Sequence, residues 1–209
     1  MPKTPFETCV FINCPLDDDY APILQAILFC IVFLGLSPRI ATERSDSAEN
    51  RLEKIRELIE SSRYSIHDLS RCQATRQGEL FRLNMPFELG IDYGCRQYSR
   101  GNRRSKKILV LEEDRYRLKA ALSDLAGCDI EAHDGEFDLA VRKVRNWLVN
   151  EAGCPRIGAS KILGAYDDFQ EWHYERQLAD GFSEHDIQDY PTKELLDAMI
   201  QWMAAGKPI

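Results

Sequence analysis

The sequence lacks the common signatures of metal and cofactor chemistry. Its seven cysteines include no C-x-x-C pair, and its four histidines are scattered along the 209 residues. An odd number of unclustered cysteines supports neither a disulfide framework nor a metal site, so we predict no metal centre and a reducing location, the cytoplasm. Neither G-x-G-x-x-G nor G-x-x-x-x-G-K-[ST] occurs, which argues against a Rossmann dehydrogenase and a P-loop NTPase.

The sequence also lacks a membrane span and an excess of basic residues. Its most apolar stretch, Ala21 to Leu36, contains Pro22 and Gln25 and is shorter than the roughly 20 residues that a bilayer requires. Three acids, residues 17–19, precede it where a signal peptide would have basic residues, so we predict a buried helix and no membrane association. The net charge of -7 argues against a nucleic-acid partner, and the basic run at 100–107 is interpreted as a solvated loop.

Short apolar runs alternate with helical patterns over the first three quarters of the chain. Strands are predicted at Cys9–Ile12, Arg39–Thr42, Tyr64–Leu69, Lys107–Leu111 and Asp129–His133. Helices are predicted at about Tyr20–Leu36, Ser47–Ser61 (capped by Asp46 or Ser47), near Pro86, at about Asp114–Ala126, and at Phe137–Glu151. Strands joined by helices require right-handed crossovers and a parallel sheet. We therefore predict an α/β, flavodoxin-like, doubly wound five-stranded parallel sheet, with the default strand order 2-1-3-4-5.

The last quarter of the chain is predicted to be a helical C-terminal extension. Gly153-Cys154-Pro155 ends the alternating pattern, and the following residues are helical in pattern and rich in aromatic side chains. We divide the chain into an α/β domain at 1–153 and an extension at 154–209 that packs on or beside it. The extension is either a packing element or an interaction surface, and we favour packing.

Ligands of open α/β sheets bind outside the carboxyl ends of the strands, and this rule directs attention to Glu88. We expect Glu88 in the first turn of its helix, where the helix dipole favours the ionised carboxylate and apolar neighbours disfavour it. Gly90 and Gly94 would allow a ligand or the sheet to approach closely. The alternative is an exposed glutamate that complements the dipole, with two packing glycines.

Three segments carry a resemblance to a known family. The strand ending in Phe11-Ile12-Asn13, the strand ending in His67-Asp68-Leu69-Ser70 and the helix Pro86-Phe87-Glu88-Leu89-Gly90 together resemble a bacterial TIR-like domain, over about residues 6–150. The helix is also similar to the Glu-x-Gly helix of nucleoside 2-deoxyribosyltransferases. Asn84-Met85 stands where many enzymatic TIR domains have a tryptophan, and Leu80-Phe81-Arg82-Leu83 replaces the acidic run of the deoxyribosyltransferases.

The resemblance implies a flavodoxin-like enzyme that breaks an N-glycosidic bond, with Glu88 stabilising an oxocarbenium-like state. Asp68 would orient Glu88 or hold a ribose hydroxyl, unless it only caps a loop. NAD would be the substrate, and no cofactor is expected. Further substrate-binding candidates, each with a structural alternative as a turn, core or solvated residue, are Asn13, Cys14, Asp17, Asp19, Tyr20, Arg44, Ser70, Asn84 and Phe87.

Three functions stay open at this stage. The first is an enzyme that cleaves or cyclises NAD in antiphage signalling, and the second is a nucleotide N-glycosidase or nucleoside 2-deoxyribosyltransferase in salvage. The third is a non-enzymatic TIR-like scaffold or nucleotide sensor. The partners expected are a nucleotide substrate and, from the resemblance, a second copy of the chain or a partner protein, so that the protein is an oligomer.

Overall fold

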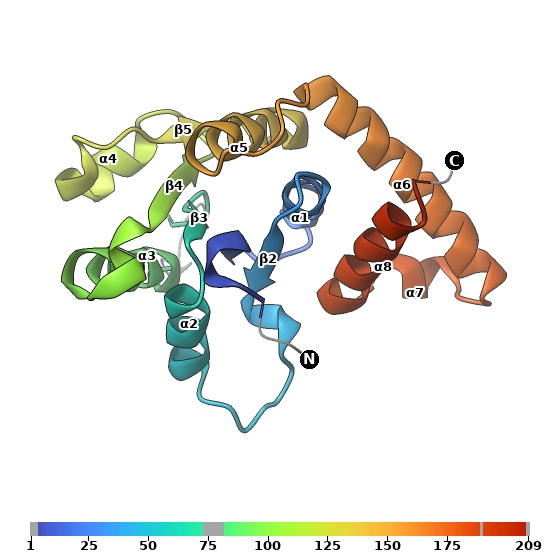
Figure 1. Cartoon of the computed structure of the whole chain (residues 1–209), viewed down its shortest axis with the longest axis horizontal. Coiled ribbons are helices and arrows are strands. Elements are labelled where there is room, and N and C mark those ends of the chain that lie inside the picture. The colour runs from blue at the N-terminus through green and yellow to red at the C-terminus, as the bar shows by residue number, and fades with distance from the viewer. Residues whose placement is uncertain (1–3, 73–81, 189, 208–209) are drawn as a thin grey trace, which may run out of the picture.

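The computed structural model describes residues 4–72, 82–188 and 190–207. Within these residues the chain forms one parallel sheet of five strands, surrounded by helices (Figure 1). The strands are β1 (Cys9–Asn13), β2 (Ser37–Ile40), β3 (Tyr64–Asp68), β4 (Lys107–Glu112) and β5 (Glu131–Ala132). Their order is β2-β1-β3-β4-β5, and every neighbouring pair is parallel. The predicted α/β class, flavodoxin-like architecture and strand order are therefore confirmed.

Helices cover both faces of this sheet (Figure 1). On one face, α1 (Ala21–Phe33) and α5 (Phe137–Glu151) share the largest core cluster with β1, β3 and β4. On the other face, α2 (Arg51–Glu60) packs on Phe11, while α3 (Asn84–Tyr98) and α4 (Arg117–Ala121) pack around Val110. The central strands are thus buried on both sides, which explains why they read as continuous apolar runs rather than alternating ones.

Several element boundaries differ from the prediction because side chains redirect the backbone. The second strand was predicted at Arg39–Thr42 but ends at Ile40, and a 3-10 turn at Ala41–Glu43 follows it, in which Glu43 pairs with Arg39. The next helix, α2, begins at Arg51 rather than Ser47 because Asn50, not Asp46 or Ser47, caps it through the N–H of Glu53.

The predicted helix at Asp114–Ala126 is interrupted. Tyr116 has a left-handed φ of 68°, and the Glu112 carboxylate accepts the N–H groups of Tyr116 and Leu118. The helix therefore starts only at Arg117, and a 3-10 turn at Ser123–Leu125 follows it. By contrast, Phe137–Glu151 is a helix over the predicted range.

Three C-terminal helices, α6 (Ala159–Ala179), α7 (Glu184–Gln188) and α8 (Thr192–Ala204), follow the α/β body. The outer side of α1 contacts α6 and α8, and Phe29 of α1 lies 5.2 Å from Tyr166, 5.5 Å from Phe169 and 5.8 Å from Trp202, measured between ring centroids. Since its opposite side faces the sheet and α5, α1 is apolar around its whole circumference. No described helix is both long and apolar enough to cross a bilayer.

Candidate functional site

A cavity of about 280 Å³ opens at the carboxyl ends of β1 and β2, beside the start of α3. This is the edge of the sheet where doubly wound folds bind their ligands, next to the strand at which the order reverses. Four charged side chains line the cavity, two acids and two arginines, so their formal charges balance. The lining residues are Ile12, Asn13, Cys14, Pro15, Leu16, Asp17, Ile40, Ala41, Arg51, Arg82, Asn84, Met85 and Glu88.

Glu88 lines this cavity while being only 6% exposed. Burial raises the pKa of the Glu88 carboxyl above its ordinary value, and the Arg51 guanidinium, 3.7 Å from Oε1, offsets part of that rise. The predicted place in the first helical turn is wrong, because α3 begins at Asn84 and Glu88 therefore lies in the second turn. The helix dipole acts mainly in the first turn, so Arg51 is the principal stabiliser of the ionised form.

The glycines of α3 face away from the cavity. A Cβ atom built on Gly90 would meet no other atom within 4 Å, and one on Gly94 would meet only the ring of Tyr98 at 4.0 Å. The expected close approach of the sheet to these glycines is therefore wrong, and neither glycine lines the cavity. Phe87 is 59% exposed and does not line the cavity, so the structure does not bring it to the position of a stacking residue.

A buried chain of polar side chains supports the cavity wall from beneath. Asn13 Nδ2 donates to the carbonyl of Met85 at 2.9 Å and lies 3.0 Å from His67 Nδ1, while His67 Nε2 lies 3.0 Å from Asp92 Oδ2. The other oxygen of Asp92 lies 3.1 Å from Lys106 Nζ. Burial acts against the Asp92 charge, but the His67 hydrogen bond and the Lys106 ammonium hold the pKa of Asp92 below its ordinary value.

Asp68 belongs to a second polar cluster rather than to the cavity wall. Its carboxylate accepts the Tyr20 hydroxyl at 2.6 Å, the Ser70 hydroxyl, and His133 Nε2 at 2.9 Å. Burial acts against ionisation of Asp68, but these three donors hold its pKa below the ordinary value. Tyr20 and Ser70 do not line the cavity either, so the structure brings these three candidates together with His133 but apart from Glu88.

The Asp68–His133–Ser70 cluster does not have the geometry of a hydrolase triad. In such a triad the serine and the carboxylate contact different ring nitrogens of the histidine. Here Ser70 Oγ lies 3.1 Å from His133 Nε2, which is the same nitrogen that contacts Asp68. The other nitrogen, Nδ1, accepts the N–H of Gly135 at 3.2 Å. The serine hydroxyl therefore donates to the Asp68 carboxylate rather than to a free histidine nitrogen, and the cluster fixes the ends of β3 and β5.

The other predicted residues divide into two groups. Cys14, Asp17 and Asn84 line the cavity as expected, together with Asn13. Asp19 is exposed outside it. Arg44 does not line it either, because its guanidinium pairs with Glu49 at 3.2 Å and Glu57 at 3.0 Å.

Sequence reasoning missed the two arginines of the cavity, Arg51 and Arg82. Arg82 pairs with Asp17 at 2.7 Å, and Arg51 is the first residue of α2. Each stands shortly before or at the start of a helix that follows a strand, and this position, which marks the ligand edge of an α/β sheet, was the available signal. Asp92, four residues after Glu88 and hence on the same helix face, was also missed.

Within the described residues, no group of three histidine, cysteine, aspartate or glutamate side chains is placed to hold a metal ion. The arrangement instead offers one nearly buried carboxylate, a cation beside it and a second arginine at the rim, which suits a polar substrate with an anionic part. No protein-family model matches the chain, and no curated protein and no solved structure matches it.

Proposed function

We propose that the chain is an enzyme that cleaves the N-glycosidic bond of NAD or a related nucleotide, with Glu88 as its catalytic carboxylate. The observation that carries this proposal is a nearly buried carboxylate in the wall of a cavity at the ligand edge of a flavodoxin-like sheet. The resemblance of its helix to those of TIR-like domains and nucleoside 2-deoxyribosyltransferases supports the same assignment.

Cleavage of a riboside builds positive charge at C1′ as the bond to the base nitrogen breaks. The ionised Glu88 carboxylate stabilises that charge or bonds to C1′, and a water oxygen then takes its place and gives its proton to the solvent. The electron pair of the broken bond leaves with the base. Nicotinamide leaves as a neutral molecule because its ring nitrogen carries a positive charge in NAD, so no strong general acid is required. One carboxylate is therefore sufficient for this reaction.

The two arginines at the edge of the cavity favour a nucleotide over a free nucleoside. The cavity volume of about 280 Å³ lies at the lower end of the range for small-molecule sites and holds roughly one nucleoside portion. Arg51 and Arg82 are partly exposed at its edge, where they can contact the phosphates that extend outwards. A phosphate-carrying substrate is thus the first choice, and a nucleoside 2-deoxyribosyltransferase is the second.

The setting of the activity is also part of the proposal. All seven cysteines are free thiols, which supports the cytoplasm as the location. From the TIR-like resemblance we further propose that the released ADP-ribose species serves antiphage signalling, and that the active form is an oligomer or a complex with a partner protein.

The decisive experiment measures base release from NAD by the wild type, Glu88→Gln and Glu53→Gln. Glu53 is an exposed residue of α2 outside the cavity, so Glu53→Gln controls for the loss of one carboxylate. We expect Glu88→Gln to lose about 100-fold or more in rate, because the charge that opposes the cation disappears. The accompanying ADP-ribose product distinguishes a hydrolase from a cyclase.

Two results would contradict the proposal. Release that continues in Glu88→Gln removes this residue from the mechanism. Absence of turnover of NAD, of nucleoside monophosphates and of 2′-deoxynucleosides, over a range of protein concentrations, leaves the cavity as a nucleotide sensor or scaffold site.

A further inference from the structure

The outer face of α3 is apolar where a surface helix normally carries charge. Of the twelve large apolar side chains exposed in the described part of the chain, four lie between residues 83 and 98. Phe87 and Tyr98 are 59% and 89% exposed, and they lie on the same side of the helix because eleven residues make about three full turns. The two acids of α3, Glu88 and Asp92, are both buried. An exposed apolar face of this kind indicates an interaction surface.

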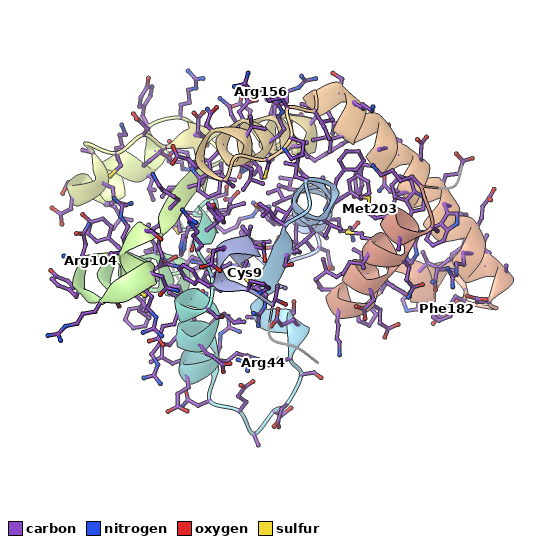
Figure 2. All side chains as sticks on the ribbon, in the orientation of Figure 1. Cys9, Arg44, Arg104, Arg156, Phe182 and Met203 are labelled. Carbon is purple, nitrogen blue, oxygen red and sulfur yellow. The ribbon has the colours of Figure 1, made fainter. Side chains whose placement is uncertain are left out.

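Positive charge adjoins this face at the C-terminal end of α3. Arg100 and Arg104 are exposed, and neither forms an ion pair with another described residue, whereas Arg103 pairs with Glu60 at 3.0 Å. Figure 2 shows Arg104 at the outer edge of the molecule beside α3. The residues that we call the α3 face are Phe87, Tyr98, Arg100 and Arg104. A surface that fits the α3 face should be apolar and negatively charged.

The outer face of α6 has this complementary character. The exposed residues that we call the α6 face are Asp167, Glu171, Tyr174, Glu175 and Leu178. They lie together because residues three and four apart are neighbours on a helix. Residues 162–175 contain no lysine or arginine, and the three acids form no ion pair within the described ranges. The α6 face therefore combines negative charge with two apolar side chains that are 41% and 44% exposed.

The two faces lie at opposite ends of the molecule, so they cannot meet within one chain. Helix α3 lies at one end of the long axis and α6 at the other (Figure 1). Arg104 and Phe182, which follows α6, mark these two ends in Figure 2. The α3 face of one copy can therefore meet the α6 face of another, and such a contact between two different surfaces is heterologous.

We propose that the chain associates head to tail, with the α3 face of one copy docked on the α6 face of a second copy. The aromatic rings of the α3 face pack on Tyr174 and Leu178 of the second copy, while its arginines pair with the acids there. Each assembly keeps one free face at either end, so association continues beyond the dimer unless a ring closes. This association does not depend on the catalytic role of Glu88.

The test is sedimentation velocity of the full chain over a range of protein concentrations. It needs no substrate, so its outcome is separate from that of the proposed cleavage of NAD. We expect the wild type to form species larger than a dimer as the concentration rises. Arg100→Glu combined with Arg104→Glu should weaken association by about tenfold or more, because like charges then face each other. Arg156→Glu, the same charge change at an exposed residue outside both faces (Figure 2), should associate like the wild type.

A mixing experiment distinguishes a head-to-tail contact from a two-fold contact. One chain carries Phe87→Ser and Tyr98→Ser, and the other carries Tyr174→Ser and Leu178→Ser. All four residues are exposed, so both chains should keep the thermal unfolding midpoint of the wild type. Each chain alone should be monomeric, whereas an equimolar mixture should form a dimer that does not grow, because each chain retains only one intact face.

Three results would overturn the proposal. The first is a wild type that stays monomeric at every concentration, and the second is an association that neither set of serine substitutions weakens. The third is a chain with an altered α6 face that still dimerises alone, because two α3 faces would then pair with each other.

Discussion

The carboxylate of Asp92 lies 3.1 Å from the ammonium group of Lys106, and both side chains are fully buried. Asp92 stands one turn after Glu88 on α3, whereas Lys106 immediately precedes β4. Lys106 also donates to the carbonyls of Ile59 and Ser62. This ion pair therefore ties the helix that carries Glu88 to the sheet and to the end of α2, and it fixes the depth at which the Glu88 carboxylate enters the cavity.

Breaking this pair should be costly. Lys106→Met leaves the Asp92 charge buried with only His67 as a strong partner, so we expect a loss of roughly 3–5 kcal/mol in the free energy of unfolding, measured with urea. Lys107→Met is the matched control, because Lys107 is 47% exposed and its pair with Glu151 lies at the surface, where about 1 kcal/mol or less is expected. Similar losses in the two variants would contradict this assignment.

Arg51 should set the pH at which the proposed cleavage of NAD begins. Arg51 lowers the pKa of Glu88 against the effect of burial, so Arg51→Met should raise that pKa further. Because the proposed mechanism uses the ionised carboxylate, the fall in kcat on the acid side should move to higher pH in the variant. Arg56→Met, an exposed change on the same helix outside the cavity, should leave the profile unchanged.

The buried Glu88 carboxylate should lower the stability of the folded protein at neutral pH. A carboxyl whose folded pKa is raised binds its proton more tightly in the folded state, so ionisation lowers stability as the pH rises above the ordinary value of 4.5. Glu88→Gln should therefore be more stable than the wild type at pH 7.5, by on the order of 1 kcal/mol. The difference should close near pH 4, and a Glu88→Gln variant less stable than the wild type at neutral pH would show that the Arg51 pair dominates.

Much of the fold was predictable because its signals are local. The apolar run of β4 and the amphipathic repeat of α5 need no tertiary information, and the crossover rule then gives the sheet. The break before α4 was not predictable, since it depends on the Glu112 carboxylate binding the two backbone N–H groups that follow the strand.

Residues of the candidate site were predictable only where their place at the carboxyl end of a strand brings them into the cavity. The strand-end rule placed Glu88, Asn13 and Asp17 correctly in the cavity. The error on Gly90 was avoidable, because residues advance by about 100° around a helix and Gly90 therefore lies roughly 200° from Glu88. Glu88 and Gly90 therefore cannot lie on the same face of the helix. The partners of Asp68 and Asp92 come from distant segments of the chain, and no local sequence pattern indicates that His133 contacts Asp68 or that Lys106 contacts Asp92.

Gly90 gives a direct test of that outward face. Its added Cβ would meet nothing within 4 Å, so Gly90→Ala should only reduce the entropy of the unfolded chain and stabilise the protein by about 0.5–1 kcal/mol. Thermal unfolding and NAD turnover should be measured together. A stabilised variant that has lost turnover or its oligomeric state would show that a second molecule packs closely on Gly90.

Asp68 should behave as a structural residue whose effect depends on pH. Asp68→Asn places an amide donor among three donors, so a loss of about 1–3 kcal/mol in unfolding free energy is expected at pH 7. Since the folded pKa of Asp68 is lowered, its contribution is present above the ordinary value and disappears as the pH falls through the folded value. The gap to the wild type should therefore narrow in acid, whereas Asp129→Asn at an exposed position should show no gap at either pH.

The all-round apolar character of α1 has a consequence for how the protein is made. The ribosome produces α1 before most of the sheet, but the helices that cover its outer side, α6 and α8, emerge only after residue 158. The nascent chain therefore carries Phe29 and its neighbours uncovered while the whole sheet is being synthesised. The outer side of α1 therefore stays open to chaperones until α6 and α8 have left the exit tunnel.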